Sequence, residues 1–397
     1  MHYWEENMDL IQRGIISLLS SAVTGEKHDL PEGFSLEQAL PYIKKHHMIP
    51  LCYAGAVNCG IPSSDPLMQQ LFQSYLKAML ISERQMKDVQ RIFDAFDQHQ
   101  IDYMPLKGCR MKLLYPKPEL RTMGDADILI RTEQYETIRG ILTALGFEEK
   151  QETDHELIWL SSGLFLELHK RLIPSYNKDY FAYFGDGWQL GIVEQGCRYA
   201  MQSEDEWVYL FTHFAKHYRD GGIGCRHVVD LWVWLRHHPE LDWTAAERKL
   251  TKLQLWDFCR NMRRLLNCWF ENGSGDEITD LMTQYIFDSG SWGQETKRLL
   301  SASLKKSKSA GSIRSGRIRA WITAFFPSAA EIAPRYPVLK RFPWMLPLVW
   351  PYRWIRAAIF GRDVIRKRKK EMDITTEDQV SQHQQALQVV GLDFHFE

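Results

Sequence analysis

Two aspartates, Asp125 and Asp127, have the residue type and spacing in this chain that best suit metal chemistry. They precede Ile128, Leu129 and Ile130, an apolar run that is typical of a short strand. Alternate residues of a strand point to the same face, so the two carboxylates should lie a few ångströms apart. Such carboxylates repel each other unless a cation lies between them, and hard oxygen ligands suit Mg²⁺. The pair predicts either a metal site for phosphoryl or nucleotidyl transfer or, with equal weight, two solvated aspartates at a strand end.

A lysine and a glycine upstream of the aspartates are suited to contact a phosphate. A short apolar strand is expected to end at Lys107 and Gly108 and to lead into a helix. This junction would direct backbone N–H groups and the positive helix end toward a bound phosphate, and Lys107 adds a charge there. Gly124 and Arg121 complete this predicted nucleotide-binding group. Arg121 could pair structurally with the nearby acids or with a triphosphate, because its guanidinium fork fits either target.

A third acid, Glu167, lies in a run that alternates cleanly along residues 164–169. The three leucines of this run form one face of the predicted strand, whereas Phe165, Glu167 and His169 form the other. An unpartnered carboxylate on a strand that otherwise resembles core is costly, so a metal ion is a sensible partner for Glu167. The alternative is a glutamate on a solvated face of the sheet.

Taken together, these segments resemble the nucleotidyltransferase fold of the DNA polymerase β superfamily. More narrowly, the chain is similar to a poorly characterised bacterial branch, the nucleotidyltransferase family proteins. The resemblance extends over roughly residues 35–270. The motifs that carry it are Leu-Lys-Gly at 106–108, Arg-x-x-Gly-Asp-x-Asp at 121–127, Glu-Leu-His at 167–169, a His-His-apolar-Pro-Leu entry at 46–51 and Arg-x-x-x-Asp-Leu at 226–231.

The resemblance implies an enzyme that uses Mg²⁺ or Mn²⁺ to move a nucleoside monophosphate from a nucleoside triphosphate to a hydroxyl acceptor. Asp125, Asp127 and Glu167 would hold the metal, and Glu167 would help to deprotonate the acceptor. The predicted nucleotide-binding group would offset charge on the phosphates. The acceptor is open between a small molecule, a sugar, a protein hydroxyl and an RNA end.

One departure from the superfamily pattern supports a different class of function. The superfamily usually has Gly-Ser or Gly-Gly where this chain has Lys107-Gly108-Cys109, so the serine that would hold a nucleotide phosphate is absent. A catalytically degenerate nucleotide-binding or regulatory protein is therefore an alternative to an enzyme. Retention of the three acids favours the enzyme.

Four further polar residues, His169, His213, His217 and Asp230, are candidates for the same cleft. His213 and His217 share a helix face, because they are four residues apart. Zinc is disfavoured there, since a zinc site needs at least three protein ligands and Phe214 stands where a metalloprotease has its glutamate. Asp230 is either an acid facing the cleft or a satisfied polar group in a helical core.

The pattern along the chain predicts an α+β protein with a small mixed-sheet core flanked by helical segments. Its 397 residues and 45% apolar content are ample for a buried core. The predicted divisions are an N-terminal helical segment (1–100), the nucleotidyltransferase core (101–200), a C-terminal helical segment (201–300) and a basic, aromatic- and proline-rich tail (301–397).

Cysteine usage predicts a cytoplasmic protein. The seven cysteines form no C-x-x-C pair, their number is odd, and no signal peptide is recognised at the start of the chain. No stretch is apolar and charge-free over a sufficient length to span a membrane.

The tail is strongly basic. Residues 301–371 contain 17 Lys and Arg against three acids, a net charge of +14, and residues 305–316 should form a loose connection. The aromatic segment that follows, with Trp344, Trp350 and Trp354, suits either an anionic surface such as a membrane or nucleic acid, or docking on the acidic remainder of the chain. Docking is slightly favoured, because so many exposed aromatics promote aggregation. A membrane-peripheral assembly factor that acts through this tail is a third functional alternative.

Overall fold

The computed structural model describes residues 9–161, 163–175, 177–310, 326–332, 336, 338–360 and 376–393. The chain divides into two compact units. The first comprises residues 1–217 and 223–292, and the second comprises residues 218–222 and 293–397. The predicted α+β class is confirmed, because a mixed sheet is combined with many helices. The predicted divisions near residues 100, 200 and 300 stay a prediction.

Seven strands form one mixed sheet in the first unit: β1 (Tyr103–Pro105), β2 (Asp125–Ile130), β3 (Glu148–Glu152), β4 (Glu156–Leu160), β5 (Phe165–His169), β6 (Gly191–Gln195) and β7 (Arg198–Met201). Their order across the sheet is β3-β4-β5-β2-β1-β7-β6. Strands β2 and β5 run parallel, as do β1 and β7, and the other neighbouring pairs are antiparallel. The strands predicted before Lys107, around residues 128–130 and along residues 164–169 correspond to β1, β2 and β5.

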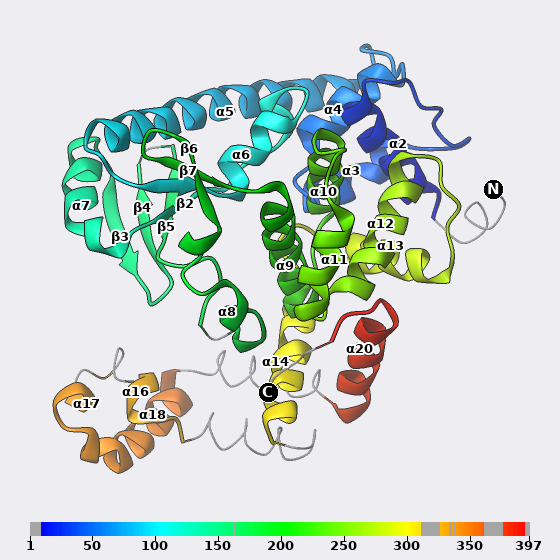
Figure 1. Ribbon diagram of the computed structural model, residues 1–397. Helices are drawn as coiled ribbons and strands as arrows, with labels where there is room; N and C mark the ends of the chain where they lie inside the picture. The colour runs from blue at the N-terminus through cyan, green and yellow to red at the C-terminus, as the bar shows by residue number, and fades with distance from the viewer. Residues whose placement is uncertain are drawn as a thin grey trace. The chain divides into compact units, whose positions relative to one another are not determined.

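Two helices pack on one face of this sheet, α5 (Pro66–Gln98) and α7 (Tyr135–Ala144). Figure 1 shows α5 running across the sheet. The even-numbered residues of β2 and β5 point toward these helices and form a single apolar cluster with them, whose members include Val89, Ile92, Phe93, Phe96, Ala126, Ile128, Ile130, Ile138, Ile141, Leu142, Leu166 and Leu168. Because successive side chains of a strand alternate, the odd-numbered carboxylates of β2 and β5 point to the opposite face.

The sequence explains where α5 begins. The Asp65 carboxylate accepts a hydrogen bond from the backbone N–H of Leu67, and Pro66 occupies the first helical position. Buried Gln85 in the middle of the helix donates to the carbonyl oxygen of Met123 at 3.0 Å. The helix therefore anchors the segment that leads into β2.

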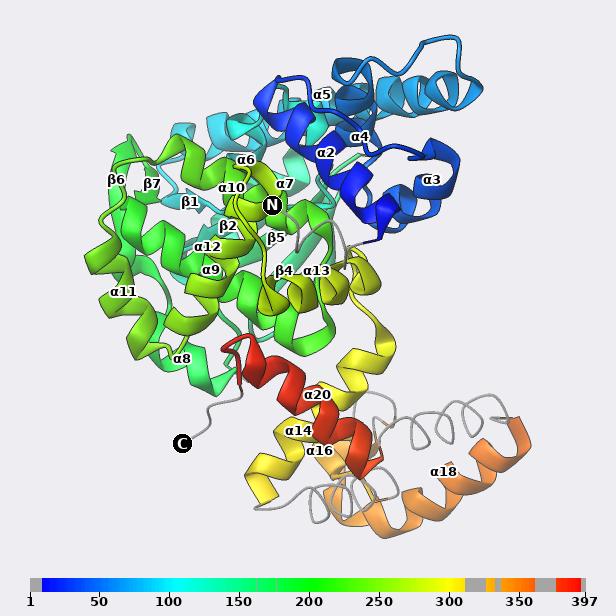
Figure 2. The ribbon, with the colours of Figure 1, turned by 90° about the vertical axis from the view of Figure 1, so that its right-hand side faces the viewer.

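Three N-terminal helices pack beside the start of α5: α2 (Leu10–Thr24), α3 (Leu36–Lys45) and α4 (Ile49–Asn58). Figure 2 shows them as a group. Helices α2 and α4 cross in backbone contact, because a Cβ atom at Gly55 would lie 1.9 Å from the carbonyl oxygen of Leu18. Glycine is required at this crossing for close approach.

The remaining helices of the first unit are α6 (Lys107–Leu114), α8 (Lys178–Phe184), α9 (Ser203–Gly221), α10 (Cys225–His237), α11 (Trp243–Lys252), α12 (Trp256–Phe270) and α13 (Glu277–Ser289). Helix α9 continues into the second unit after His217. Buried aromatic side chains pack between these helices. The Trp207 ring lies 5.4 Å from that of Trp234, and the Phe211 ring lies 5.5 Å from that of Phe258. Such pairs favour tilted or edge-to-face contacts.

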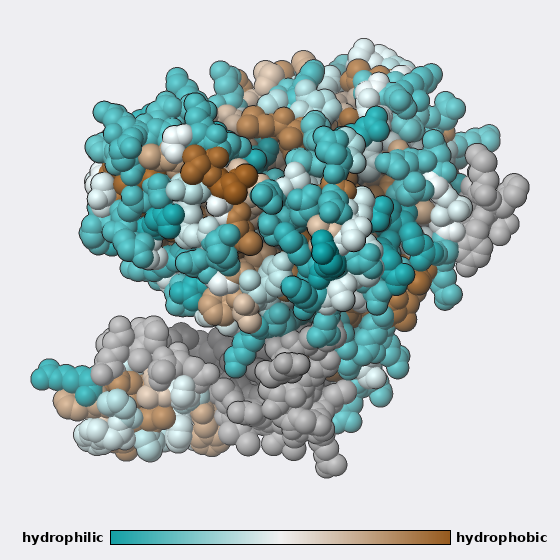
Figure 3. All heavy atoms as spheres, viewed as in Figure 1, coloured by the Kyte–Doolittle hydropathy of each residue, from teal (hydrophilic) through white to brown (hydrophobic). Residues whose placement is uncertain are grey.

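The two edges of the sheet differ in character. Edge strand β3 is exposed along its whole length and carries charged residues, which discourage pairing with another chain. At the other edge, Ile192 and Val193 of β6 are exposed. Figure 3 shows apolar surface over the β6–β7 hairpin. The sheet therefore presents one charged and one partly apolar edge.

The second unit contains α14 (Glu295–Ala310), α16 (Ala329–Ile332), α17 (Val338–Arg341), α18 (Leu346–Phe360) and α20 (Glu377–Val389). Helices α14 and α20 pack together, and Ser301 joins them by a 2.9 Å contact with His383. The loop predicted for residues 305–316 is wrong for its first part, because α14 continues to Ala310. The buried leucines of α14 extend its apolar face and stabilise the helix. Residues 311–316 lie outside the described residues.

The aromatic part of the tail forms contacts of its own. Trp350 donates from its indole N–H to the carbonyl oxygen of Pro327 at 3.0 Å, whereas Trp344 is 72% exposed. Much of the basic sequence, residues 311–325 and 361–375, lies outside the described residues. Docking of the tail on the first unit therefore stays a prediction. Within the part of the chain that the structure describes, no helix has the length and apolar character needed to cross a membrane.

Candidate active site

The parallel pairing of β2 with β5 brings the predicted acids together. Asp127 lies directly across from Glu167 in the register of the two strands, and Asp125 lies two residues earlier on the same face. Ligand atoms of Asp127, Glu167 and His169 all lie within 4.8 Å of one another. Adjacent strands are about 4.8 Å apart, so the pairing alone sets this proximity. The three acids, which were predicted from two separate motifs, thus lie on one face of the sheet.

The surroundings of Glu167 and Asp125 disfavour the ionised form of their carboxyl groups. Burial raises the pKa of Glu167 to about 8, and the negative charges of Asp127 and Asp125 add to this effect. Burial and the neighbouring Asp127 likewise raise the pKa of Asp125. No hydrogen bond or ion pair within the described residues involves the Asp125 carboxylate. Desolvation and like charge together favour protonation or a bound cation.

Asp127 differs from these two acids, because it has cationic and hydrogen-bonding partners. Lys107 Nζ lies 3.2 Å from Asp127 Oδ1, and His169 Nε2 lies 2.8 Å from the same oxygen. Burial alone would raise the pKa of Asp127, but Lys107 and the hydrogen bond of His169 hold it below its usual range. Asp127 is therefore the ionised member of the cluster.

Lys107 is oriented from several sides. It is the first residue of α6, and its Nζ lies 3.5 Å from His213 Nε2 as well as beside Asp127. Burial would lower the pKa of Lys107, but the negative charges of Asp127 and Asp125 hold it above its ordinary value. Burial and Lys107 lower the pKa of His213 well below its usual value, so the neutral ring accepts a hydrogen bond from the ammonium group. The predicted phosphate-binding lysine thus contacts the carboxylate cluster directly.

Position 108 requires glycine because the backbone of β2 lies very close to it. A Cβ atom there would lie 3.0 Å from the carbonyl oxygen of Asp125, with the Met123 side chain just beyond it. The backbone N–H of Leu106 also donates to the carbonyl oxygen of Asp127 at 2.9 Å. The start of α6 and the start of β2 are therefore in backbone contact, which places Lys107 next to the two aspartates.

Two histidines in contact with each other, His169 and His155, extend the site along the sheet. His169 Nδ1 lies 3.2 Å from His155 Nε2, and burial lowers the pKa of His155 to about 3. Both contacts are satisfied when neutral His155 donates to His169 and His169 donates to Asp127. The two rings, together with Glu156, form a second group that has the ligand types of a metal site. Through this chain His169 fixes the orientation of Asp127.

Arg121 and Asp230 form a buried ion pair. Arg121 donates from Nε and Nη2 to the two oxygens of Asp230, at 2.8 and 3.0 Å. Tyr115 donates to Asp230 at 2.7 Å, and Lys112 donates to the backbone carbonyl of Arg121 at 2.7 Å. Arg121 thus pairs with Asp230 and not with Asp125 or Asp127, and its predicted contact with a triphosphate stays a prediction. Asp230 is correspondingly a satisfied polar group in a helical core, one of its two predicted alternatives.

The other predicted residues lie at the margin of the cluster. His217 contacts the ring of His213, with 4.4 Å between ring centroids, and so lies one position farther from Lys107. Gly124 lies beside an aromatic ring, because a Cβ atom there would be 3.7 Å from Trp292. The Trp292 indole N–H donates to His47 Nε2 at 3.0 Å, and the side chain is 67% exposed.

Several residues near the site were not predicted, chiefly Arg226, Tyr209, His155 and Trp292. Arg226, the second residue of α10, donates to the carbonyl oxygen of Thr122 at 2.6 Å and opposes the rise in the pKa of Asp125. Its position four residues before Asp230 was a usable signal, because the two lie on one helix face. The other three come from segments distant in sequence, and nothing in their local pattern marks them.

Comparisons with known proteins found one family model and one solved structure that are similar to this chain. A family model described as an uncharacterised nucleotidyltransferase matches residues 32–271. Among solved structures, the chain is similar to the antibiotic-resistance factor ANT(2'')-Ia, with 13% identity, a TM-score of 0.31 and coverage of 43% of this chain and 91% of that chain. No curated protein matches the chain. The resemblance drawn from the motifs is confirmed by the family match, which covers more than half of the sequence. The chain therefore belongs to the family of uncharacterised nucleotidyltransferases.

Proposed function

We propose that the protein is a metal-dependent enzyme that transfers a nucleoside monophosphate from a nucleoside triphosphate to a hydroxyl acceptor. The observation that carries this proposal is the convergence of Asp125, Asp127 and Glu167 on one face of the sheet, beside Lys107. Carboxylates that are buried, close together and of raised pKa are typical of a site that receives a cation.

The donor set fits Mg²⁺ or Mn²⁺. Three carboxylates supply hard oxygen ligands, which these ions prefer over sulfur or nitrogen. Asp125, which has no partner among the described residues, and Glu167 would hold the ion together with Asp127. A divalent ion bound there would polarise the phosphate under attack and offset the charge that develops on it.

The residues around the cluster have distinct tasks in this proposal. Lys107 and the first N–H groups of α6 bind the phosphates of the nucleotide. His169 holds Asp127 in a fixed orientation, and His213 does the same for Lys107. Glu167 takes the proton of the acceptor hydroxyl, since its carboxylate lies beside the proposed metal site and a cation bound there would keep it ionised.

Trp292 is our candidate for contact with the nucleobase. It is largely exposed, its indole N–H is held by His47, and its ring lies beside Gly124, directly before Asp125. Stacking of a base on an aromatic side chain contributes about 1–3 kcal/mol and is tolerant of base identity. We expect Trp292→Ala to raise KM for the nucleotide about tenfold with little change in kcat, measured by steady-state kinetics.

A second candidate function is nucleotide binding without transfer. Two observations favour it: Cys109, at the position of the usual serine, is buried, and Lys107 already neutralises Asp127. The same fold would then bind a nucleotide in a regulatory role.

Pyrophosphate release separates these candidates. The four nucleoside triphosphates are offered with Mg²⁺ or Mn²⁺ and a panel of hydroxyl acceptors, and nucleotide binding is measured in parallel by calorimetry. The proposal expects release by the wild type and by the control Glu152→Gln, an exposed acid of β3, but a loss of more than about a thousandfold in Asp125→Asn. Nucleotide binding without release under any of these conditions would favour the regulatory protein.

A further inference from the structure

A group of nitrogen ligands lies beside the carboxylate cluster, where β4 begins and β5 ends. Among the described residues, ligand atoms of at least three histidine, cysteine, aspartate or glutamate side chains come within 4.8 Å of one another in two places. One place is formed by Asp127, Glu167 and His169, and the other by His155, Glu156 and His169. The second group has two imidazoles and one carboxylate, so its donor set differs from that of the oxygen site proposed for Mg²⁺ or Mn²⁺.

The pairing of β4 with β5 brings this second group together. The two strands are antiparallel, and Glu156 lies directly across from His169. Residues in such positions point to the same face of the sheet and have Cβ atoms about 5 Å apart. His155 comes immediately before β4, and its carbonyl oxygen accepts a hydrogen bond from the backbone N–H of Lys170 at 2.9 Å. The backbone of the sheet therefore holds all three residues in place.

The distances within this group are close to those of a zinc site. His169 Nδ1 lies 3.2 Å from His155 Nε2. Two nitrogen ligands that lie about 2.0–2.1 Å from a tetrahedral Zn²⁺ ion are about 3.3–3.4 Å apart. Glu156 Oε2 lies 3.8 Å from the same nitrogen of His155, and its side chain is partly exposed. A shift of this carboxylate by about half an ångström would complete the three-ligand arrangement.

His169 is already held as a metal-binding histidine is held. Its Nε2 lies 2.8 Å from Oδ1 of the buried, ionised Asp127, so the ring proton belongs on Nε2 and the lone pair of Nδ1 is directed toward His155. Histidines that bind metals almost always donate their other ring N–H to a carboxylate or a carbonyl group. In the metal-bound form His155 would carry its own proton on Nδ1, which makes no hydrogen bond among the described residues.

The charges around the group leave Glu156 available as a ligand. Apart from the contact with the neighbouring histidine, its carboxylate has no hydrogen bond or ion pair in the part of the chain that the structure describes. Two cationic residues follow β5, and both are paired with other acids. Lys170 lies 2.7 Å from Glu152, and Arg171 lies 3.5 Å from Asp154. Glu156 is therefore not neutralised by either of them.

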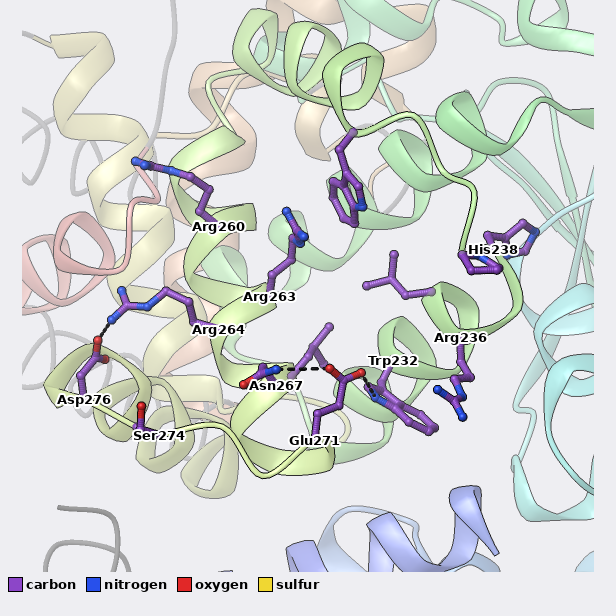
Figure 4. A pocket seen from close by; sticks show the side chains of 15 residues that line it. Trp232, Arg236, His238, Arg260, Arg263, Arg264, Asn267, Glu271, Ser274 and Asp276 are labelled. Atoms are coloured by element: carbon purple, nitrogen blue, oxygen red, sulfur yellow. Dashed lines mark hydrogen bonds and ion pairs between the residues drawn. The ribbon is translucent and has the colours of Figure 1, made fainter. Parts of the chain in front are cut away.

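A large cavity among α10, α11 and α12 also contains a histidine and two acids, but it does not suit a metal ion (Figure 4). Its volume is about 860 Å³, and His238, Glu271 and Asp276 belong to its lining. These three side chains do not form one of the ligand groups found among the described residues. Arg236 and Arg263 lie in the same lining and would repel a cation.

We propose that His155, Glu156 and His169 bind a transition-metal ion of the Zn²⁺ class, at a site separate from the carboxylate cluster. Imidazole nitrogen suits such ions, whereas Mg²⁺ prefers oxygen ligands. Three protein ligands leave the fourth position of a tetrahedral ion open to water. The bound ion replaces the hydrogen bond between the two imidazoles and holds His169 against Asp127. The inference does not depend on the proposed transfer reaction, because its ligands and its test involve metal binding alone.

Calorimetric titration of the metal-free, full-length protein with Zn²⁺ and, separately, with Mg²⁺ tests this proposal. The site variants are His155→Gln and Glu156→Gln. The second variant guards against a folding defect, because the Glu156 side chain is partly exposed and contacts only the neighbouring histidine. Two controls identify other locations of the ion. Asp125→Asn removes a carboxylate of the other site, and His217→Gln removes an exposed histidine that contacts His213 on α9.

We expect Zn²⁺ to bind the wild type and both controls with similar dissociation constants. Each site variant should weaken Zn²⁺ binding at least about tenfold to a hundredfold, since loss of an outer partner of a metal-bound histidine already costs that much and a direct ligand should cost no less. Mg²⁺ binding should be the same in the wild type and in His155→Gln. Co²⁺ should give the visible absorption of a tetrahedral site in the wild type and lose it in Glu156→Gln.

Two results would overturn the proposal. Unchanged Zn²⁺ affinity in either site variant would show that the group is only a hydrogen-bonded pair of histidines beside an acid. Loss of Zn²⁺ binding in Asp125→Asn or in His217→Gln would place the ion in the carboxylate cluster or on the histidine pair of α9 instead.

Discussion

Asp125 and Asp127 lie two residues apart on one face of β2, yet their electrostatic environments are opposite. Asp127 is ionised by Lys107 and His169, whereas Asp125 has a raised pKa and no ion-pair partner among the described residues. The two aspartates therefore affect folding stability in opposite directions. Neutralising each carboxylate in turn should reveal this difference.

We expect Asp125→Asn to raise and Asp127→Asn to lower the free energy of unfolding in EDTA at pH 7. The first change removes a charge that burial and Asp127 disfavour, whereas the second leaves the Lys107 ammonium buried without its partner. Loss of one member of a buried ion pair costs about 3 kcal/mol. Urea unfolding of both variants measures the difference. Equal shifts of the same sign would show that the two carboxylates are not in distinct environments.

Glu167 should make the metal-free protein less stable as pH rises. Its pKa is about 8 in the folded protein and about 4.5 when unfolded, so the folded state binds more protons between these values. Stability that is present below pH 4.5 is therefore lost as pH increases to 8. Glu167→Gln removes this loss, and in EDTA its melting temperature should exceed that of the wild type at pH 8 and approach it at pH 5.

Differential scanning fluorimetry across that pH range provides the measurement, with Glu37→Gln as a control on the exposed surface of α3. A difference between wild type and Glu167→Gln that stays constant with pH would contradict a raised pKa for this carboxyl group.

At the scale of elements, the site depends on how α6, β2, β5 and α10 are joined. Parallel pairing sets Glu167 beside Asp127, and backbone contact between α6 and β2 places Lys107 next to them. Helix α10 adds the ion pair of Asp230 with Arg121, which lies in the segment before β2. This pair fixes the segment that carries the two aspartates.

We expect Asp230→Ala to lower the free energy of unfolding by about 3–5 kcal/mol, because it leaves the Arg121 guanidinium buried without a partner. The paired change Arg121→Met with Asp230→Leu should recover a large part of that loss, since no uncompensated charge then remains. Chemical denaturation of the single and paired variants gives the coupling energy. A single variant that costs less than about 1 kcal/mol would show that the ion pair does not hold this segment.

At the scale of the whole molecule, the function of the basic tail is a question separate from that of the active site. Within the second unit, Trp344, Leu348 and Tyr352 near α18 are exposed. Exposed aromatic and apolar side chains in a basic segment suit the interface of an anionic membrane. Surface binding and docking on the first unit both stay predictions, and vesicle binding separates them.

The full-length protein should bind vesicles that contain anionic lipid, with a blue shift of tryptophan emission. Binding should weaken as salt is raised from 0.1 to 1 M, because the Debye length falls from about 10 Å to about 3 Å. Trp344→Phe should reduce the change in emission, whereas Trp243→Phe, in the first unit, should not. Emission that is unchanged by such vesicles would support docking of the tail instead.

Much of the fold and the site could be predicted from local sequence. Strict alternation over residues 164–169 identified β5 and the face of Glu167, and Asp65-Pro66 identified the start of α5. These features depend on side-chain periodicity and capping, which act over a few residues. The motifs also indicated the family, which the match over residues 32–271 confirms.

The tertiary structure decided what those residues do to one another. The sequence suggested a triphosphate or the nearby acids as partners of Arg121, whereas the packing of α10 supplied Asp230. His155 and Trp292 reached the site, and Arg236 and Arg263 came to line one cavity, through contacts between segments distant in sequence. Local patterns carry no information about such contacts, because these contacts form when the faces of separate helices and strands pack against each other. The raised pKa of Glu167 has the same origin, since desolvation and neighbouring charge exist only in the packed molecule.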